Sequence, residues 1–370
     1  MRTRETLRVA VDANGADLGP AEVAAGAALA AAEGARVLLF GPAEEIGQTP
    51  EGVELVNAPL SIAKSADPTQ AVRANPQASI VQAAKAVAEG RADALVCAGG
   101  TGAALAAGLF NIKRAKGVHR PALALPLPSP NGTVTLLDVG ASVEARREHL
   151  VQFAFMGAAL VKIVLGVEQP RVALLSNGQE QERGTPLIVE AHAELRERCV
   201  GAPFSFIGNL EGGDVMDGVA DVVVADGFTG NVSLKLIEGV SSTVLGAVRN
   251  VATSSLRAKL GGALLLPALR SFREQIDPEA QGGAYLLGLR SLGVVPHGRF
   301  SRNGFKNAIL RAQLGAEQDL IGSTHAALEQ AGALRRVPLG GTSQSAEIET
   351  SQNAEIEDAT SENDVSLRAQ

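Results

Sequence analysis

Short apolar runs rich in Val, Leu and Ala recur along the first 227 residues, and stretches with helical character such as AEVAAGAALAAAEG separate most of them. Strands that are apolar throughout and alternate with helices are typical of a mainly parallel sheet covered by helices on both faces. The pattern therefore predicts an α/β protein with a three-layer α/β/α, doubly wound fold. The nine runs that we interpret as strands are residues 8–13, 35–41, 53–59, 92–99, 121–127, 133–140, 171–178, 204–209 and 220–227.

Six of the predicted strands end in polar or glycine-rich sequence, and such ends are candidates for a binding site. Ligands of open α/β sheets bind outside the carboxyl ends of the strands, so we expect the six ends to converge on one crevice. A single glycine-rich turn is ordinary loop geometry, whereas six ends that share the feature favour a site. The six are DANGAD at 12–17, AGGTG at 98–102, LDVGAS at 137–142, SNGQE at 176–180, GNLEGGD at 208–214 and ADGFTGN at 225–231.

The chain becomes helical after Gly227, and its stretch from 250 to 275 is leucine-rich with basic residues among the leucines. Gly261, Gly262 and Pro267 interrupt this stretch, so the sequence predicts a protruding, broken amphipathic hairpin. Such a hairpin can lie on an anionic membrane surface or pack in a dimer interface, and the residues alone favour neither. The candidate membrane contacts are Leu260, Leu264, Leu265, Leu266 and Leu269.

Charge divides the chain into a nearly neutral body, residues 1–336, and an acidic tail, residues 337–370. The formal net charge is −7, and the tail holds seven acidic residues against one basic residue. The tail lacks the apolar surface that would offset its ordering entropy, so we expect it to be disordered. The body is long enough to bury a large core, and we interpret it as a catalytic domain.

The cysteines and the amino-terminal residues indicate a cytosolic protein without a structural metal. Cys97 and Cys199 are far apart, and the sequence has no Cys-x-x-Cys pair and no His/Cys spacing typical of zinc sites. The first residues enter a strand directly and show no secretory signal. The uncharged stretch 94–110 nearly reaches the length of a membrane span, but its Gly-Gly-Thr-Gly centre favours a strand, a turn and a helix start.

Several common catalytic motifs are missing from the sequence, and this narrows the chemistry. There is no P-loop, no Gly-x-Ser-x-Gly elbow and no His-Glu-x-x-His pair. The nearest dinucleotide fingerprint, residues 100–105, lacks its third small residue and is followed by Arg120 and Pro121 instead of an acidic ribose ligand. The five histidines are scattered, although His297 follows an apolar run and can border the crevice. We therefore expect no cofactor, no metal and no nucleic-acid partner.

The remaining sequence features indicate binding of an anion. Unsatisfied amides at a helix start, reached through a glycine-rich turn, hold phosphate well, and residues 99–102 and 229–231 have this form. Lys235 lies four residues beyond Asn231 on the same helical face, so it can reach back toward an anion at the helix start. The pattern suggests a phosphate pocket with an acidic lip at Asp226. In the alternative interpretation, Asp226 only caps the helix and Lys235 faces solvent.

Several segments together resemble bacterial phosphate acyltransferases of phospholipid synthesis, in order from about residue 8 to residue 315. They include VDANGAD, ADPTQAVR, ADALVCAGGTGAALAAGLF, LLDVGASVE, DGVADVVVADGFTGNV and QGGAYLLGL. The resemblance implies transfer of a long-chain fatty acyl group from acyl-carrier protein to orthophosphate, without a cofactor. The product, acyl-phosphate, would feed a membrane glycerol-3-phosphate acyltransferase for phosphatidic acid synthesis. It also implies a homodimer that attaches peripherally to the inner face of the cell membrane, which favours the membrane role of the hairpin.

The resemblance further implies a fold related to isocitrate and isopropylmalate dehydrogenases and to phosphotransacetylase, and it selects site residues. Gly100 and Ser142 stand where relatives commonly have Asn, and the segment 13–17 also departs from the family pattern. The candidate catalytic residues are Asp138, Asp226, Asn231 and Lys235. The candidate phosphate or substrate ligands are Asp12, Asp17, Gly99, Gly100, Thr101, Gly102, Asn209, Thr229, Gly230 and His297.

Acyl-carrier protein is acidic, so we expect a basic docking surface. Lys113, Arg114, Lys116 and Arg120 lie in one short stretch, although their charges can equally complement the dipole of the preceding helix. Three rival functions stay open at this point. They are an NAD(P)-dependent dehydrogenase of the related fold, a phosphotransacetylase-like enzyme that uses acyl-CoA, and a non-catalytic membrane scaffold built around the hairpin.

Overall fold

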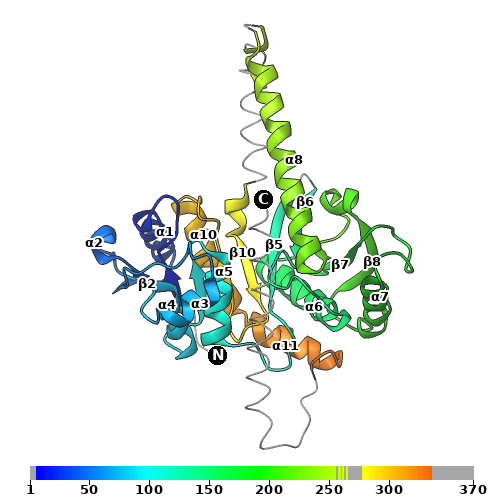
Figure 1. Ribbon diagram of the computed structural model, residues 1–370, viewed down its shortest axis with the longest axis horizontal. Coiled ribbons are helices and arrows are strands. Elements are labelled where there is room, and N and C mark those ends of the chain that lie inside the picture. Colours follow the sequence, from blue (N-terminus) through cyan, green and yellow to red (C-terminus); the bar gives the residue numbers. More distant parts are fainter. Residues whose placement is uncertain are drawn as a thin grey trace, which may run out of the picture. The chain divides into compact units, whose positions relative to one another are not determined.

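The computed structural model describes residues 6–129, 131–255, 257–259, 261, 264–265 and 277–335 (Figure 1). The first elements are β1 (Arg8–Asp12), α1 (Pro20–Ala32), β2 (Arg36–Gly41), α2 (Ala43–Ile46), β3 (Val53–Asn57), α3 (Pro68–Ala74), α4 (Ser79–Ala88), β4 (Ala94–Cys97), α5 (Thr101–Ala107), the π-helical turn η1 (Gly108–Ile112) and β5 (Ala122–Ser129). They are followed by β6 (Gly132–Leu137), α6 (Arg147–Val164), β7 (Arg171–Ser176), α7 (Pro186–Arg198), β8 (Ser205–Glu211), the 3₁₀ turn η2 (Gly212–Asp217) and β9 (Val222–Val224). The last are α8 (Gly227–Thr253), η3 (Pro278–Gln281), β10 (Ala284–Leu287), β11 (Gly293–Val295), α10 (Arg302–Glu317) and α11 (Leu320–Gln330).

The described strands form one sheet in the order β3-β2-β1-β4-β11-β10-β5-β6-β9-β7-β8. Neighbours pair in parallel except at three central steps, β11–β10, β10–β5 and β5–β6. Three reversals mean that β1, β4 and β11 run opposite to β6, β7, β8 and β9. The carboxyl ends of the strands therefore lie on two opposite sides of the sheet. We call the side where β1 ends the β1 edge and the side where β6 ends the β6 edge.

These directions confirm the mainly parallel sheet, but the expected convergence of six strand ends on one crevice is wrong. The ends of β1 and β4, at 12–17 and 98–102, lie at the β1 edge, whereas the other four ends lie at the β6 edge. The cause is the antiparallel pairing of β5 with β6, which are joined by the short turn between Ser129 and Gly132. As a result β6, and with it β9, β7 and β8, runs opposite to β1.

Helices cover both faces of the sheet and form two separate cores. One core contains buried side chains of α1, α6, α7, α10 and α11, such as Phe153 and Phe305. The other contains buried side chains of α3, α4, α5 and the start of α8, such as Ile80 and Leu234. The predicted three-layer α/β/α fold is therefore confirmed.

The predicted strands are all present as β1 to β9, whereas β10 and β11 were not predicted. The uncharged stretch 94–110 forms β4, a turn, α5 and part of η1, as its glycines indicated. Among the described residues, no helix combines the length and the hydropathy that crossing a membrane requires.

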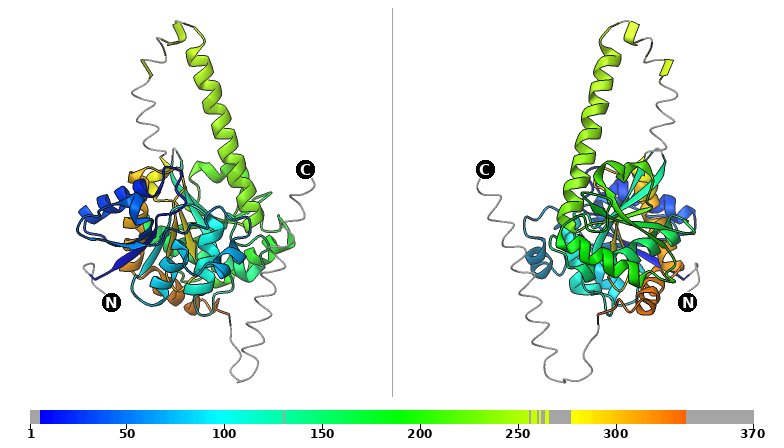
Figure 2. Two further views of the ribbon diagram at one scale, coloured as in Figure 1. Left: turned by 60° about the vertical axis from the view of Figure 1, so that its left-hand side comes forward. Right: turned by 90° about the vertical axis from the view of Figure 1, so that its right-hand side faces the viewer.

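Helix α8 confirms the helical prediction after Gly227, and it extends well beyond the sheet in every view (Figures 1 and 2). All residues from Gly239 to Val251 are exposed. Exposed apolar side chains repeat every four residues along it, at Val232, Leu236, Val240, Val244 and Val248. Of the predicted membrane contacts, Leu264 and Leu265 are exposed, while Leu260, Leu266 and Leu269 lie outside the described residues, as does the tail 337–370.

Candidate functional site

At the β1 edge, the loops after β1 and β4 pack backbone against backbone. Gly15, with a φ of 106°, lies against the carbonyl of Ala98, and Gly99, with a φ of 136°, lies against the carbonyl of Gly15. A Cβ at Gly15 would stand 2.7 Å from the first oxygen, and a Cβ at Gly99 would stand 2.8 Å from the second. Only glycine combines these φ values with so close an approach, so both glycines shape the loops.

Asp12 is buried beneath these loops at the end of β1. Its Oδ1 accepts the amide of Asn14 at 3.1 Å, and Cys97 Sγ lies 3.6 Å from its Oδ2. The hydroxyl of Ser79 also hydrogen-bonds to the carboxyl group, and it accepts Asn14 Nδ2 at 2.9 Å. Burial raises the pKa of Asp12 to about 6 against these hydrogen bonds. With 2% of its surface exposed, Asp12 supports the loops from behind and does not face a substrate.

Helix α5 begins directly after these loops, at Thr101. Its N-cap residue, Gly100, has no side chain that could accept the first amides, and Thr101 and Gly102 are exposed. The first helical hydrogen bond comes from the amide of Ala104, which donates to Gly100 O at 2.9 Å. A Cβ at Gly100 would collide with the carbonyl of Ala63, so this glycine allows the loop after β4 to meet the segment between β3 and α3. The turn therefore presents backbone donors at the positive end of a short helix.

At the β6 edge, Asp138 organises the loop that follows β6. Its fully buried side chain accepts the amides of Leu123, Gly140, Ala141 and Ser142 at 2.7 to 3.1 Å. Burial raises its pKa to about 6, and the four amide donors oppose that rise. Its oxygens are occupied by the loop, so Asp138 orients neighbouring groups and does not itself contact a substrate.

The first turn of α8 is held by its N-cap residue and by the same loop. Asp226 Oδ1 accepts the Thr229 amide at 2.9 Å, and its Oδ2 accepts the Thr229 hydroxyl at 2.7 Å. The amide of Gly227 donates to Ser142 O at 2.9 Å. Asp226 therefore caps the helix, as the alternative interpretation of the sequence has it. Because the amides of Gly227 and Thr229 are already hydrogen-bonded, the groups of this turn that can contact a ligand are its exposed side chains.

Thr229 and Asn231 are the exposed polar residues at the start of α8, and the latter approaches the loop after β6. A Cβ at Gly140, whose φ is 129°, would lie 2.8 Å from Asn231 Nδ2. Gly140 therefore leaves the room that the amide of Asn231 occupies. The Asn231 side chain lies beside the loop that Asp138 organises.

Lys235 lies further along α8, with 66% of its side chain exposed, and it pairs with Glu238 at 2.8 Å. Both charges act on His297, which follows β11 at the β1 edge, and so does the charge of Asp17 from the loop after β1. The pKa of His297 is lowered, first by burial and then by the nearby Arg299. Helix α8 thus brings Lys235 toward the β1 edge, where residues from the two halves of the sheet meet. The solvent-exposed interpretation of Lys235 also matches this geometry.

Asn209 and the basic stretch lie apart from these groups. Asn209 is on β8, at the end of the sheet order, where its Nδ2 donates to Glu180 O of the loop after β7 at 2.8 Å and its Oδ1 lies 2.9 Å from His192 Nδ1 of α7. Lys113 and Lys116 are exposed after η1 at the β6 edge, and Arg120 is half-buried. The half-buried Arg114 donates to the carbonyl of His119.

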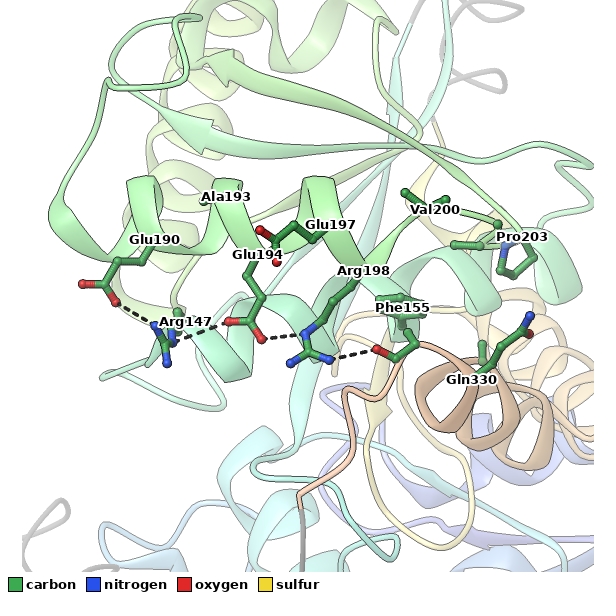
Figure 3. A pocket seen from close by; sticks show the side chains of 14 residues that line it. Arg147, Phe155, Glu190, Ala193, Glu194, Glu197, Arg198, Val200, Pro203 and Gln330 are labelled. Atoms are coloured by element: carbon green, nitrogen blue, oxygen red, sulfur yellow. Dashed lines mark hydrogen bonds and ion pairs between the residues drawn. The ribbon is translucent and has the colours of Figure 1, made fainter.

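A cavity of about 690 Å³ lies between α6, α7 and α11, on the face of the sheet opposite α5 and α8 (Figure 3). Its two arginines are both paired with Glu194, which accepts Arg198 Nε at 2.7 Å and lies 3.5 Å from Arg147. The residues proposed above do not line it. We therefore do not assign the reaction to this cavity.

The fold is shared with phosphotransacylases of known structure. The EutD phosphotransacetylase of Staphylococcus aureus aligns with a TM-score of 0.56 at 16% identity, covering 85% of this chain and 95% of that one. A branched-chain phosphotransacylase of Enterococcus faecalis aligns with a TM-score of 0.52 at 15% identity, covering 84% of this chain and 99% of that one. At such low identity these likenesses establish the fold alone.

Closer relatives establish the family. The model of the family described as "Fatty acid synthesis protein" matches residues 7–322. The phosphate acyltransferase of Geobacillus thermodenitrificans is 42% identical over 330 residues, covering 88% of this chain and 99% of its own. That of Pelotomaculum thermopropionicum is 39% identical over 330 residues, covering 87% and 95%. The chain therefore belongs to the phosphate acyltransferase family, which confirms the resemblance, and it is an enzyme.

Proposed function

We propose that the protein transfers a long-chain acyl group from acyl-carrier protein to orthophosphate. A phosphate oxygen attacks the thioester carbonyl, the C–S bond breaks, and the carrier leaves as a thiolate that takes up a proton. The nucleophile is already anionic near neutral pH, and a thiol of pKa about 8.5 is a good leaving group. The enzyme needs no covalent nucleophile of its own; it must hold two anionic partners together and stabilise the oxyanion of the tetrahedral intermediate.

The side chains of α8 and the turn before α5 supply donors of the required kind. The charge of the exposed Lys235 acts on His297 at the β1 edge, where the exposed Thr101 and Gly102 begin α5, and we assign orthophosphate to Lys235 and this helix start. Thr229 and Asn231 are exposed at the start of the same helix, and we assign the developing oxyanion to them. Asp226 and Asp138 orient these donors, the first through Thr229 and the second through the loop beside Asn231.

Membership of the phosphate acyltransferase family is the observation that supports this proposal most directly. The test combines the full-length protein with acyl-carrier-protein thioester and orthophosphate. We expect phosphate-dependent release of the carrier thiol, and hydroxylamine should trap the acyl-phosphate as a hydroxamate. Thiol release that does not depend on phosphate, or that yields no hydroxamate, would contradict the proposal.

A second candidate, which the sequence leaves open, is transfer from acyl-CoA. The same assay with acyl-CoA of equal chain length separates the two donors. Acyl-carrier protein is the donor if its kcat/KM exceeds that of acyl-CoA. The reverse order would favour the second candidate.

The exposed apolar residues of α8 are a candidate contact surface for a partner. We call Val232, Leu236, Val240, Val244 and Val248 the ridge. Val232, Val240 and Val248 are each more than half exposed on a helix that extends beyond the sheet, and we propose that this ridge packs against a second copy of the chain. The exposed Leu264 and Leu265 beyond it would contact the inner surface of the cell membrane. A membrane glycerol-3-phosphate acyltransferase would then take over acyl-phosphate, which hydrolyses if it is left in water.

A further inference from the structure

Lys113 adopts a backbone conformation that residues other than glycine rarely tolerate. It follows the π-helical turn η1, and its φ of 69° and ψ of 162° fall in a region used almost only by glycine. Strained residues persist where the surrounding structure fixes them, and both they and π-helical turns cluster at functional sites. A glycine would relieve the strain here, so the presence of a lysine points to a use for its side chain.

A second segment fixes Lys113 and adds another cation beside it. The amide of Arg290 donates to Lys113 O at 3.0 Å, and the next residue, Arg114, pairs with Leu289 in an antiparallel bridge. The two segments run side by side like short strands. This contact places Arg290 next to Lys113, and both residues are exposed.

Further cations continue this surface toward α6. Lys116 is exposed in the same loop, and Arg120 and Arg146 lie close to His149 at the start of α6. The pKa of His149 falls to about 4, first because of burial and then because of neighbouring positive charges that include these two arginines; Glu148 opposes them. Its Nδ1 accepts the Arg146 amide at 3.1 Å, as a neutral ring must. The surroundings are therefore positive in balance.

Arg114 has a different part in this region. Its guanidinium donates to the carbonyl of His119 and so closes the loop that carries Lys116. This bond assigns Arg114 to the framework of the loop. Arg290, which is remote in sequence, provides the exposed cation in its place.

The surface adjoins the start of α8. Arg120 precedes Pro121, whose carbonyl accepts Ser142 Oγ at 3.2 Å. The carbonyl of Ser142 in turn accepts the amide of Gly227, the first residue of α8, at 2.9 Å. A partner bound to the surface therefore lies one loop away from the exposed Thr229 and Asn231.

We propose that Lys113, Lys116, Arg120 and Arg290, which we call the basic surface, form the docking surface for an acidic acyl-carrier protein. The inference rests on the proposed function, because the carrier is the acyl donor assigned there. Complementary charge steers such a partner and fixes its orientation, and the hydrogen bond from the Arg290 amide holds the Lys113 backbone in place.

The experiment compares the full-length protein with the double charge reversal Lys113→Glu/Arg290→Glu. We expect the KM for acyl-carrier-protein thioester to rise about tenfold, as for the loss of two steering charges, while the KM for orthophosphate stays within twofold. The KM of the unchanged protein should also rise with ionic strength more steeply than that of the variant. The matched control reverses Arg36 and Lys162, which are exposed on β2 and α6.

An equal rise in both KM values, or the same rise in the control, would overturn the docking surface. A wild-type protein that does not use the carrier at all would instead overturn the proposed function. Lys113→Gly gives an independent test, because it removes the strain together with the charge. We expect its Tm to rise while the KM for the carrier also rises; a lower Tm or an unchanged KM would contradict the inference.

Discussion

Gly230 of α8 lies so close to the main-chain carbonyl of Asp138 that the space between them has no room for a Cβ atom. This contact seats the first turn of α8 on the loop after β6. Gly230→Ala should therefore push the helix away from the loop and lower the free energy of unfolding by about 1–3 kcal/mol. It should also slow the formation of acyl-phosphate. Urea unfolding and the hydroxamate assay measure the two effects.

The control for this substitution comes from the same helix. A Cβ at Gly239 would have no neighbour within 4 Å, so Gly239→Ala should stabilise α8 by about 0.5–1 kcal/mol. If both alanines had the same effect, the contact with Asp138 would not matter.

Lys235 should matter for turnover and not for stability. Its pair with Glu238 is exposed, and exposed pairs contribute about 0–1 kcal/mol. Lys235→Ala should lower phosphate-dependent kcat/KM by about a hundredfold, the usual scale for a lost transition-state donor. Glu238→Gln keeps the positive charge and should leave kcat/KM within about threefold of the wild-type value, well short of that loss. Unchanged kinetics of Lys235→Ala would remove this residue from the mechanism.

The two buried carboxyl groups should make stability depend on pH. The pKa of Asp12 is raised from 3.8 to about 6, so the folded protein holds this proton more tightly than the unfolded chain. The contribution of Asp12 is fully present below about pH 4 and is lost as the pH rises through about 6, by about 3 kcal/mol. Asp12→Asn should lose less stability than wild type between pH 4.5 and 7.5 in urea unfolding.

Asp138 has a similarly raised pKa, but its substitution should behave differently. Four amides donate to its carboxyl oxygens, and an Asn side chain would turn an NH₂ group toward some of them. Asp138→Asn should therefore be less stable than wild type at every pH. A flat, wild-type-like stability for this variant would show that the loop does not depend on the carboxylate.

The apolar ridge of α8 should control assembly. Val244→Glu/Val248→Glu places two charges on the ridge and should convert the proposed dimer to monomer in sedimentation velocity. Ser242→Glu/Thr253→Glu adds the same charge on the opposite side of the helix and should leave the dimer intact. Equal sedimentation of the two variants would contradict an interface at the ridge.

The leucines beyond α8 should act on membranes only. Leu264→Glu/Leu265→Glu should weaken co-sedimentation with anionic vesicles, because both residues are exposed and apolar. The oligomeric state should not change. Vesicle binding equal to that of wild type would place the membrane contact elsewhere.

Much of the fold could be predicted from the sequence, because strand and helix patterns are local. The runs at 121–127 and 133–140 are strands, as the pattern predicts, but their mutual direction decides where β6, β7, β8 and β9 end. The signal was available in Asn131–Gly132 between two apolar runs, which is typical of a hairpin. Strands β10 and β11 were missed because glycines bound their short apolar runs and no helical stretch separates them.

The candidate site could be predicted only in part. Glycine-rich turns marked the loops after β1 and β4 because positive φ and close approach leave a local trace. The hydrogen-bond partners of Asp12 could not be predicted in this way. Ser79 and Cys97 lie on other elements, and only the fold brings them to Asp12. The same holds for Arg290, which reaches Lys113 across a gap of more than 170 residues.

Helix α8 has 27 residues, which corresponds to about 40 Å, and it joins the Thr229 hydroxyl at one end to an apolar, water-exposed half at the other. Such a rod has few ways to bend without breaking its own hydrogen bonds. A partner bound to the outer half of α8 therefore constrains the orientation of its first turn. The rate of acyl transfer should then depend on whether such a partner is bound.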